Sequence, residues 1–473
     1  MVLKHQIGDS SVLEKPEDSG CKCNNDKDIK DGLFNVWHNY SSSTTLHCLS
    51  RAAKVESSLM RRFVWYVFLA AMFGLLLWQC YTQISRYLQR ETILNEHSAL
   101  NEDRVFPSLT ICDVNNVKKS NVQNPQVQEV LTKTYMESAT NKSYFNHLDV
   151  NWLRSINVSD IFYNHSVFDM FLLCTWEKKP IPCSSIFIQR VTSAGICATH
   201  KGMVLSESGG VGSGNGLVVI LHSNISDYLV TSRAGAGFRV LLHTHNEEPD
   251  VEEHGFALSP GTASIIAVTK YQRFPIPAFG DDFCVDTTAS DYVHQLKYIS
   301  KYSYGACVTD CFTAFVQEIC GCRDVFMPGD IPVCNIDQRI NCFEAAEVSF
   351  ISNSSCECGN PCEEISYLPE VSYGSFPYPG YLTTTFPDIQ VSEEYMKSNG
   401  LMFEVFMKSD MYIQRKQILE FTEADLVAAV GGYMGLFIGA SIGTIMELLE
   451  FFCDLMMNLS KKLKARTHDI KKK

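Results

Sequence analysis

The sequence predicts a membrane protein with two transmembrane helices and one large, disulfide-rich extracellular domain that mixes helices and strands. The first observation is a pair of uncharged runs, 23 residues from Phe63 to Ser85 and 21 residues from Leu426 to Met446. About 20 apolar residues are needed to cross the hydrocarbon core of a bilayer as a helix. No other stretch of the 473 residues meets that length. The second observation is that most of the cysteines lie between these two runs.

The first run is neither a signal peptide nor a buried core helix by its sequence. It starts after 62 residues and is too long for the apolar region of a signal peptide. A core helix is rarely apolar on all its faces over so many turns. The second run is rich in glycine, which weakens it as an isolated helix but is typical of membrane helices that pack closely or line a pore.

Charges next to the runs predict the orientation. Arg51, Lys54, Arg61 and Arg62 precede the first run, and seven lysines and arginines follow the second. Positive flanks mark the cytoplasmic side, so both termini are expected in the cytosol of a multi-pass plasma-membrane protein. The formal net charge of −13 is concentrated between the runs, where it would attract cations. The predicted parts are a cytosolic N-terminus with a juxtamembrane segment (1–62), a first span (63–85), an extracellular domain (86–424), a second span with the pore (425–453) and a basic cytosolic tail (454–473).

Cysteines and glycosylation sequons support the extracellular assignment. Fourteen of the 19 cysteines lie between the spans, and an even number outside the cell indicates seven disulfides. Ten of them fall within 284–362, which predicts a heavily cross-linked rod. The pairing cannot be chosen from the spacing alone. Glycans are expected on five asparagines in Asn-X-Ser/Thr sequences: Asn141, Asn157, Asn164, Asn224 and Asn353.

Two apolar runs in the extracellular part, 216–222 and 237–243, have the pattern of strands. The glycine-rich segment 207–216 precedes the first of them. It lacks the Gly-Lys-Ser/Thr ending of a phosphate-binding loop, so a flexible turn is the simpler interpretation.

Motifs for enzymatic or cofactor chemistry are absent from the sequence. There is no Gly-X-Ser-X-Gly, no His-Glu-X-X-His and no phosphate loop, so an enzyme is not expected. His243, His245 and His254 could hold a metal ion, but three histidines without a fixed fourth ligand often occur by accident. We therefore expect no metal, no cofactor and no nucleic-acid partner.

The second span carries the residues that favour ion conduction. One helix cannot enclose a pore, so several copies would have to surround an axis. Gly439, Ala440 and Ser441 would let the copies approach closely and expose carbonyl oxygens to an ion. Helix packing through small residues four apart is the alternative. Acidic residues favour the pore, because carboxylates near a membrane are costly unless they face water, and rings of them favour cations. These acids are Glu423 and Asp425 at the outer end and Glu447, Glu450 and Asp454 at the inner end.

The sequence also resembles a known family. GGYMGLFIGAS (431–441) is similar to the pore signature of the degenerin/epithelial sodium channel/acid-sensing ion channel family, whose filter is a short belt of small residues. The resemblance extends over about residues 37–454. It includes TLHC (45–48), FPSLTIC (106–112), GNGLVVIL (214–221), FRVLLHTHNEEP (238–249) and the order of all fourteen extracellular cysteines.

The resemblance implies a homo- or heterotrimer in a lipid bilayer, with an extracellular domain shaped like a clenched hand. It further implies a sodium-selective, amiloride-sensitive pore with Gly439, Ala440 and Ser441 as its filter. The disulfides that it implies are Cys112–Cys197, Cys174–Cys183, Cys284–Cys362, Cys307–Cys358, Cys311–Cys356, Cys320–Cys342 and Cys322–Cys334.

Several gating positions depart from the family pattern. The His-Gly pair of the family is His47-Cys48 here, so the conformational freedom of glycine is lost. The tryptophan that meets a tyrosine of the first span is replaced by Phe279, which would face Tyr87. Ala428 and Ala429 lie just ahead of the pore glycines, and Ala429 stands where the acid-sensing branch has an acid.

These departures disfavour protons as the stimulus. No histidine follows Tyr87 closely, and histidine is the side chain suited to a physiological pH switch. We therefore expect a channel opened by a short, amidated extracellular neuropeptide, with constitutive and proton-gated opening as alternatives. External calcium could bind Glu423 and Asp425. A cysteine-rich cell-surface receptor that does not conduct is the alternative of another class, and it would need neither the small-residue belt nor the inner acids.

Overall fold

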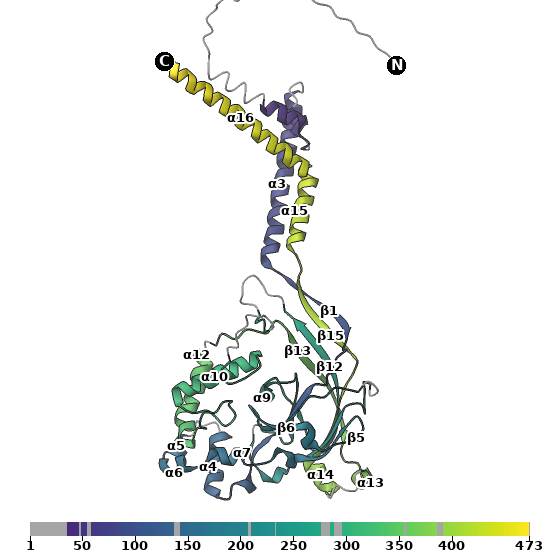
Figure 1. Cartoon of the computed structure of the whole chain (residues 1–473), viewed down its shortest axis with the longest axis vertical. Coiled ribbons are helices and arrows are strands. Elements are labelled where there is room, and N and C mark those ends of the chain that lie inside the picture. Colours follow the sequence, from purple (N-terminus) through teal and green to yellow (C-terminus); the bar gives the residue numbers. More distant parts are fainter. Residues whose placement is uncertain are drawn as a thin grey trace, which may run out of the picture. The chain divides into compact units, whose positions relative to one another are not determined.

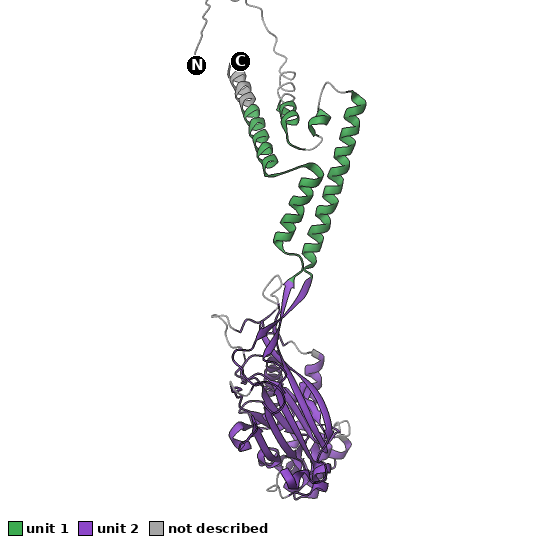
Figure 2. Ribbon diagram, turned by 90° about the vertical axis from the view of Figure 1, so that its right-hand side faces the viewer, with its two compact units in different colours: residues 1–91, 419–473 green, residues 92–418 purple. Residues whose placement is uncertain are grey.

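The computed structural model describes most of the chain as two compact units. The described residues are 36–46, 49–53, 58–136, 142–206, 210–231, 233–275, 284–287, 296–353, 356–385 and 391–472, with the side chains of 142, 353 and 461–472 left aside. One unit comprises residues 1–91 and 419–473, and the other comprises 92–418 (Figure 2).

The first unit contains the helices that can cross a membrane. α3 (Leu59–Gln89) includes the predicted first span and is long and apolar enough to cross by itself. α15 (Glu423–Ile438) runs beside it (Figure 1). Together with residues 442–460 of α16 (Ile442–Lys472), α15 qualifies as one broken span with a bend of 72°. A short helix, α2 (Leu49–Ala53), precedes α3.

The second span therefore differs from the single helix predicted over 425–453. Gly439 follows α15 with a φ of 68°, in the left-handed region where glycine carries no steric penalty. The chain leaves the helix there and re-enters it at Ile442. The tail after 454 continues as part of α16 up to Lys472.

Two large sheets form the centre of the second unit. The first has the strand order β1-β15-β12-β14-β8-β4-β5, and β13 pairs with β12 in addition. Its strands are β1 (Thr92–Leu100), β4 (Phe171–Trp176), β5 (Lys179–Pro180), β8 (Leu217–His222), β12 (Thr262–Phe274), β13 (Glu364–Ser375), β14 (Gly400–Met407) and β15 (Met411–Leu419). The second has the order β11-β10-β2-β7-β6. Its strands are β2 (Ser108–Asp113), β6 (Phe187–Thr192), β7 (Gly195–His200), β10 (Phe238–His243) and β11 (Phe256–Leu258).

The main hydrophobic core contains side chains from both of these sheets. Phe238 from β10 and Leu221, Ile266 and Phe403 from the larger sheet are fully buried in it. Each such side chain contributes roughly 1.5–3 kcal/mol through the apolar surface removed from water. The predicted strands at 216–222 and 237–243 are confirmed as β8 and β10.

Helices and a two-stranded sheet, β3 (Asn115–Lys118) with β9 (Tyr228–Thr231), complete the unit. α4 (Pro125–Tyr135) begins with proline at its first position and is capped by the Asn124 side chain. α10 (Tyr304–Cys320) is capped by Ser303 and ends at Gly321, whose φ is 68°. The other described α-helices are α5 (Lys142–Phe145), α6 (Val150–Ser155), α7 (Val158–Tyr163), α8 (Cys183–Ile186), α9 (Val251–His254), α11 (Ile336–Gln338), α12 (Glu344–Asn353), α13 (Tyr381–Thr385) and α14 (Glu393–Asn399). Three short 3-10 helices, η1 (Lys119–Asn121), η2 (Val167–Met170) and η3 (Ile225–Asp227), and a π-helix, η4 (Arg339–Phe343), join them.

Seven disulfides cross-link the second unit, in the pairs that the family resemblance implies. Five of them join cysteines within 284–362, where α10 and α12 lie. Their Cα–Cα distances run from 4.8 to 6.3 Å, within the usual range for a disulfide. The cross-linked segment thus includes both helices, and α10 itself carries Cys307, Cys311 and Cys320.

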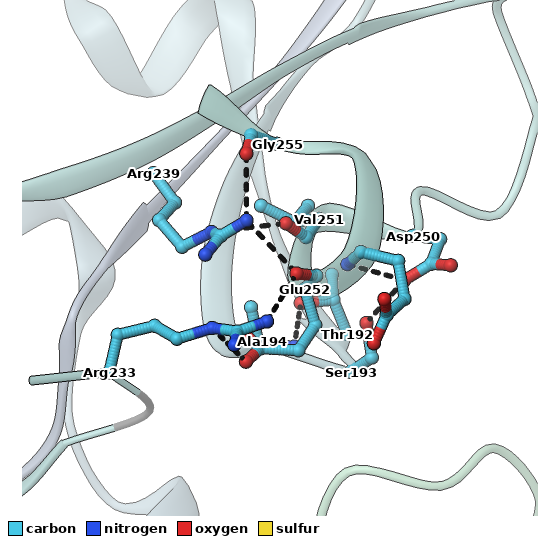
Figure 3. Close-up of polar contacts among 10 residues, drawn as sticks. Thr192, Ser193, Ala194, Arg233, Arg239, Asp250, Val251, Glu252 and Gly255 are labelled. Carbon is cyan, nitrogen blue, oxygen red and sulfur yellow. Dashed lines mark hydrogen bonds and ion pairs between the residues drawn. The ribbon is translucent and has the colours of Figure 1, made fainter. Parts of the chain in front are cut away.

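An arginine of β10 binds backbone carbonyls of the short helix α9 (Figure 3). The Arg239 guanidinium donates to the backbone carbonyls of Val251, Glu252 and Gly255 at 3.2, 2.9 and 2.7 Å. Arg233 forms an ion pair with the Glu252 carboxylate at 2.7 Å. The acidic run around α9 is therefore partly neutralised, and its last carbonyls are satisfied, by positive charges from neighbouring segments.

Candidate functional site

The predicted filter residues occupy the break between α15 and α16. The backbone amides of Gly439 and Ala440 donate to the carbonyls of Gly435 and Met434, both at 3.1 Å, and so close the end of α15. The carbonyl of Ser441 accepts from Ile445 at the start of α16. No hydrogen bond from a described residue reaches the carbonyls of Gly439 and Ala440. These two oxygens are therefore the ones suited to meet an ion.

The Ser441 side chain has a second role as the cap of α16. Its hydroxyl lies 3.4 Å from the Thr444 amide, and the Thr444 hydroxyl accepts from the Ser441 amide at 3.1 Å. This reciprocal arrangement satisfies amides that a helix start leaves without partners. Ser441 was expected in the filter from its sequence, whereas this cap and the part of Thr444 in it were not predicted.

Glu447 is held by the segment that precedes the first span. Its carboxylate accepts hydrogen bonds from the Thr44 hydroxyl and the Thr45 amide, both at 3.0 Å. The Thr45 hydroxyl lies 2.9 Å from that of Thr444, which is buried. The only sequence signal for Thr44 and Thr45 was the family-like TLHC that starts at Thr45. His47 and Cys48, which follow directly, lie outside the described residues.

Aromatic side chains extend the same contact. The rings of Trp37 and Tyr40, in a helical stretch at 36–43, lie 6.2 and 4.6 Å from the ring of Phe451 on α16. The N-terminal segment is thus packed along the first turns of α16 through both polar and aromatic contacts.

The three inner acids share one face of α16. Glu447, Glu450 and Asp454 are spaced by three and four residues, which places them above one another on a helix. Glu450 and Asp454 are exposed in the single subunit, whereas Glu447 is half-buried. The helix therefore presents a stripe of carboxylates that starts within two turns of the filter.

The two outer acids both have partners in their own subunit. The Tyr87 hydroxyl donates to the Glu423 carboxylate at 3.1 Å, and the Arg90 guanidinium lies 5.0 Å from the Tyr87 ring. Asp425 accepts from the Thr422 amide and hydroxyl in a capping box at the start of α15. Ion pairing between Arg86 and Glu420, at 2.8 Å, adds to the contact between the two spans.

The structure describes only some of the remaining residues that were predicted to act in gating. Ala428 is exposed and Ala429 half-buried in α15, in the turns before Gly431. Phe279 lies outside the described residues, so its expected contact with Tyr87 is not placed.

Three of the five predicted glycosylation sites lie on described, exposed positions. Asn164 is exposed beyond the end of α7, and Asn157 caps that helix. The Asn224 side chain accepts a hydrogen bond of 2.8 Å from Ser226, the serine of its own sequon. Asn141 lies outside the described residues, and the side chain of Asn353 is not described.

The three histidines considered as metal ligands each have other partners. His243 lies 2.8 Å from both the Thr110 hydroxyl and the Thr244 carbonyl. His245 contacts Ser108, and His254 lies 3.4 Å from Asp250. Within the described ranges no group of three potential ligands has the geometry of a metal site.

Titratable groups in the second unit fall into two classes. Burial raises the pKa of Asp113 to about 6, even though the Ser223 hydroxyl, the Asn115 amide and the Tyr228 hydroxyl all donate to its carboxylate. Burial lowers the pKa of His200 to about 4. Asp113 therefore titrates near mildly acidic pH, whereas His200 stays neutral there.

Together these features define a class of protein: a membrane protein whose second span is broken at a belt of small residues and carries acids beyond it, with a disulfide-rich domain between its spans. The sequence profile described as the amiloride-sensitive sodium channel family matches residues 40–451. The chain belongs to this family.

Individual relatives agree with the family match. Acid-sensing ion channel 4-B of Danio rerio is 30% identical over 92% of this chain and 78% of its own length. Acid-sensing ion channel 1A of Danio rerio is 28% identical over 88% of this chain and 87% of its own length. Acid-sensing ion channel 2 of Mus musculus is 27% identical over 91% of this chain and 89% of its own length. A solved proton-activated chloride channel, at 8% identity and a TM-score of 0.31, is too dissimilar to define the fold.

Proposed function

We propose that this chain is one subunit of a trimeric, sodium-selective and amiloride-sensitive channel of the plasma membrane, with both termini in the cytosol. The observation that carries the proposal is the broken second span. Its two non-helical carbonyls at Gly439 and Ala440 receive no hydrogen bond from a described residue, and the stripe of carboxylates follows within two turns. Dipoles of this kind replace the hydration shell of a cation, and the acids raise its local concentration.

A trimer supplies what one subunit lacks. A single α15–α16 break presents its carbonyls to one side only, so an ion would keep most of its water. Three copies around an axis would surround the ion and set Glu447, Glu450 and Asp454 in rings. The exposure of Ser441, Glu450 and Asp454 in the single subunit leaves these positions accessible to such an axis.

For the stimulus, a short amidated extracellular peptide remains our first candidate. Peptides of this kind carry positive charge at their amino end, and the second unit is strongly acidic. Its buried histidines, His200 and His243, have pKa values lowered by burial to about 4, so they do not become charged at mildly acidic pH.

Proton gating is the second candidate, and one observation favours it. The carboxyl group of Asp113 has a pKa raised by burial to about 6 and contacts residues from several strands and loops. Relatives named acid-sensing ion channels point the same way. Constitutive opening is the third candidate.

Whole-cell recording separates these candidates. Cells that express the chain alone, and then with related subunits, would receive a panel of amidated peptides and, separately, steps to pH 6. We expect a peptide-evoked sodium current that amiloride blocks. A large current on acidification with no response to any peptide would reverse the order of the stimuli, and surface expression without any current would favour the non-conducting receptor.

A further inference from the structure

An apolar cavity of about 420 Å³, open to the surroundings of the subunit, lies in the first unit between the segment before the first span and the two spans themselves. Its lining is almost entirely carbon. The main contributors are Leu46 and Leu49 before the span, Leu69, Ala70 and Phe73 on α3, and Ile438 on α15. The volume falls within the range of about 300–1,000 Å³ that small-molecule sites occupy. Two of its lining side chains, Tyr66 and Phe73, are 46% and 50% exposed, so the cavity opens onto the surface of the subunit.

We propose that this cavity binds an acyl chain of an anionic phospholipid from the cytosolic leaflet. Part of the lining comes from α3, which is long and apolar enough to cross a bilayer, so lipid chains are the apolar molecules at hand. Burial of the chain against leucine and phenylalanine side chains supplies the apolar part of the binding.

The charges around the cavity select the headgroup. Arg51 lies with its guanidinium 5.5 Å from the ring of Trp65, the neighbour in sequence of the lining residue Tyr66. Arg61 and Arg62 lie in the first turn of α3, and neither that turn nor the first turn of α2 carries an acid. Clusters of basic residues at the cytosolic end of a span attract anionic lipids, by about fivefold in affinity per residue. A cationic ligand would be repelled from the same place.

The cavity also reaches the candidate filter. Ile438, which closes one wall, is the last residue of α15 and directly precedes Gly439. A lipid chain in the cavity therefore packs against the residue at which the second span breaks, and it would support the bend from behind.

The amount of lipid that stays bound to the purified protein tests the proposal, and no ion current has to be recorded. The full chain, purified as its assembled channel and placed in nanodiscs of mixed phosphatidylcholine and phosphatidylserine, would be examined by native mass spectrometry for lipid that remains bound. We expect phosphatidylserine to be retained preferentially. Ala70→Phe, which fills the cavity, should abolish the retention, and Arg51→Gln should weaken the preference for phosphatidylserine about fivefold.

Matched variants separate the cavity from general effects on the span. Ala71→Phe adds the same bulk to an exposed neighbouring position of α3 that does not line the cavity, and Arg154→Gln removes an exposed arginine of the second unit. Both should keep the wild-type retention. Equal loss with Ala70→Phe and Ala71→Phe, or retention indifferent to headgroup charge, would overturn the proposal. So would a crosslink from the introduced thiol of the Ala70→Cys variant to a neighbouring subunit, because a protein side chain would then fill the cavity.

Discussion

The Glu447 carboxylate joins two segments that lie about 400 residues apart in the chain. It accepts hydrogen bonds from Thr44 and Thr45, which precede the first span. Its place after the small-residue belt predicts a ring of acids in an assembled channel, and these bonds would hold one oxygen of each carboxylate in that ring. Sequence spacing carries no information on such a contact, because nothing local to either segment requires the other. The family-like sequence TLHC at 45–48 is the one signal in the sequence that points to that segment.

The Thr45 hydroxyl also donates to the Glu447 carboxylate, at 3.2 Å, so an energetic coupling between these two side chains is expected. Thr45→Ala and Glu447→Gln should each shift the concentration of agonist needed for half-maximal current, and the double variant should shift it by less than the sum. Residues in direct hydrogen-bond contact usually couple by about 0.5–3 kcal/mol. A double-mutant cycle on whole-cell dose–response curves measures this coupling.

Glu450 provides the matched control acid, because it lies three residues further along the same face of α16. Thr45→Ala combined with Glu450→Gln should give additive shifts within about 0.3–0.5 kcal/mol. Additivity in the Glu447 cycle as well would show that the Thr45–Glu447 contact has no part in gating.

His200 predicts how the stability of the second unit depends on pH. The imidazole is fully buried among the rings of Phe106, Trp176 and Phe187, and burial lowers its pKa to about 4. In the unfolded chain its pKa returns to about 6.5, so the unfolded state takes up a proton first as the pH falls. Stability should therefore decrease below pH 6.5, by about 2 kcal/mol from this residue at pH 5.

Thermal melting of the purified channel between pH 7 and pH 4.5 tests this dependence. His200→Phe should flatten the slope, because the replacement cannot bind a proton. Asp113 acts in the opposite direction, since its raised pKa of about 6 stabilises the folded state as the pH falls. An Asp113→Asn background should therefore steepen the acid loss, and an unchanged slope in His200→Phe would exclude His200 as its source.

At the scale of elements, the break in the second span shows what a glycine-rich sequence can and cannot predict. The sequence indicated small residues that weaken a helix, and it placed the filter at Gly439, Ala440 and Ser441. It could not say which glycine interrupts the helix. Gly431, Gly432 and Gly435 all remain within α15, and only Gly439 adopts a left-handed conformation. That choice depends on the capping of both helix ends, which involves Met434 and Thr444 together.

Gly439 should tolerate only residues that accept a left-handed conformation. Gly439→Ala is expected to destabilise the bend by about 1 kcal/mol or more and to favour a continuous helix, with loss of current or of sodium selectivity. Gly439→Asn should be milder, because asparagine adopts this conformation more readily. Reversal potentials in sodium and potassium solutions, normalised to surface expression, measure the effect, and equal behaviour of the two variants would contradict the conformational explanation.

The Cys284–Cys362 disulfide should matter most among those of the cross-linked segment. It closes the longest loop there, with a sequence separation of 78, against 12 for Cys322–Cys334. Loop-closure entropy predicts about 4.5 kcal/mol for the long loop and about 3 kcal/mol for the short one. Replacing both Cys284 and Cys362 by serine should therefore largely prevent surface delivery in a biotinylation assay. The double serine variant of Cys322 and Cys334 is the comparison, and normal delivery of the first variant would refute this ranking.

At the scale of the whole molecule, composition and charge predicted the parts of the chain but not the pairing of its strands. Spans, cysteine-rich domain and two strands followed from apolar runs, flanking charges and residue alternation. The sheet order could not be predicted, because β12 pairs in parallel with both β14 and β15, which follow it by more than 120 residues. Parallel pairing between strands so far apart in the chain forms through long-range contacts and leaves no local signature in the sequence.

The assembled channel should be inhibited by external calcium at its outer acids. Three copies would place six carboxylates of Glu423 and Asp425 around the entrance, and calcium prefers such oxygen ligands. Glu423→Gln with Asp425→Asn should relieve the inhibition. Glu420→Gln is the control, since Glu420 is nearby but its charge is compensated by the Arg86 guanidinium. Glu423 and Asp425, in contrast, accept hydrogen bonds from uncharged groups. Inhibition that persists after both neutralisations would assign the calcium effect to another site.

The length of α15 also determines how far into the transmembrane electric field the candidate filter would lie. Its 16 residues rise about 24 Å, which is less than the hydrocarbon thickness of about 30 Å. With Glu423 at the outer surface, Gly439 would lie deep in the bilayer, past most of the transmembrane field. An impermeant external cation that stops at the filter would cross that fraction of the field, at up to about 2.3 kcal/mol per charge for each 100 mV. Its block should therefore strengthen steeply on hyperpolarisation.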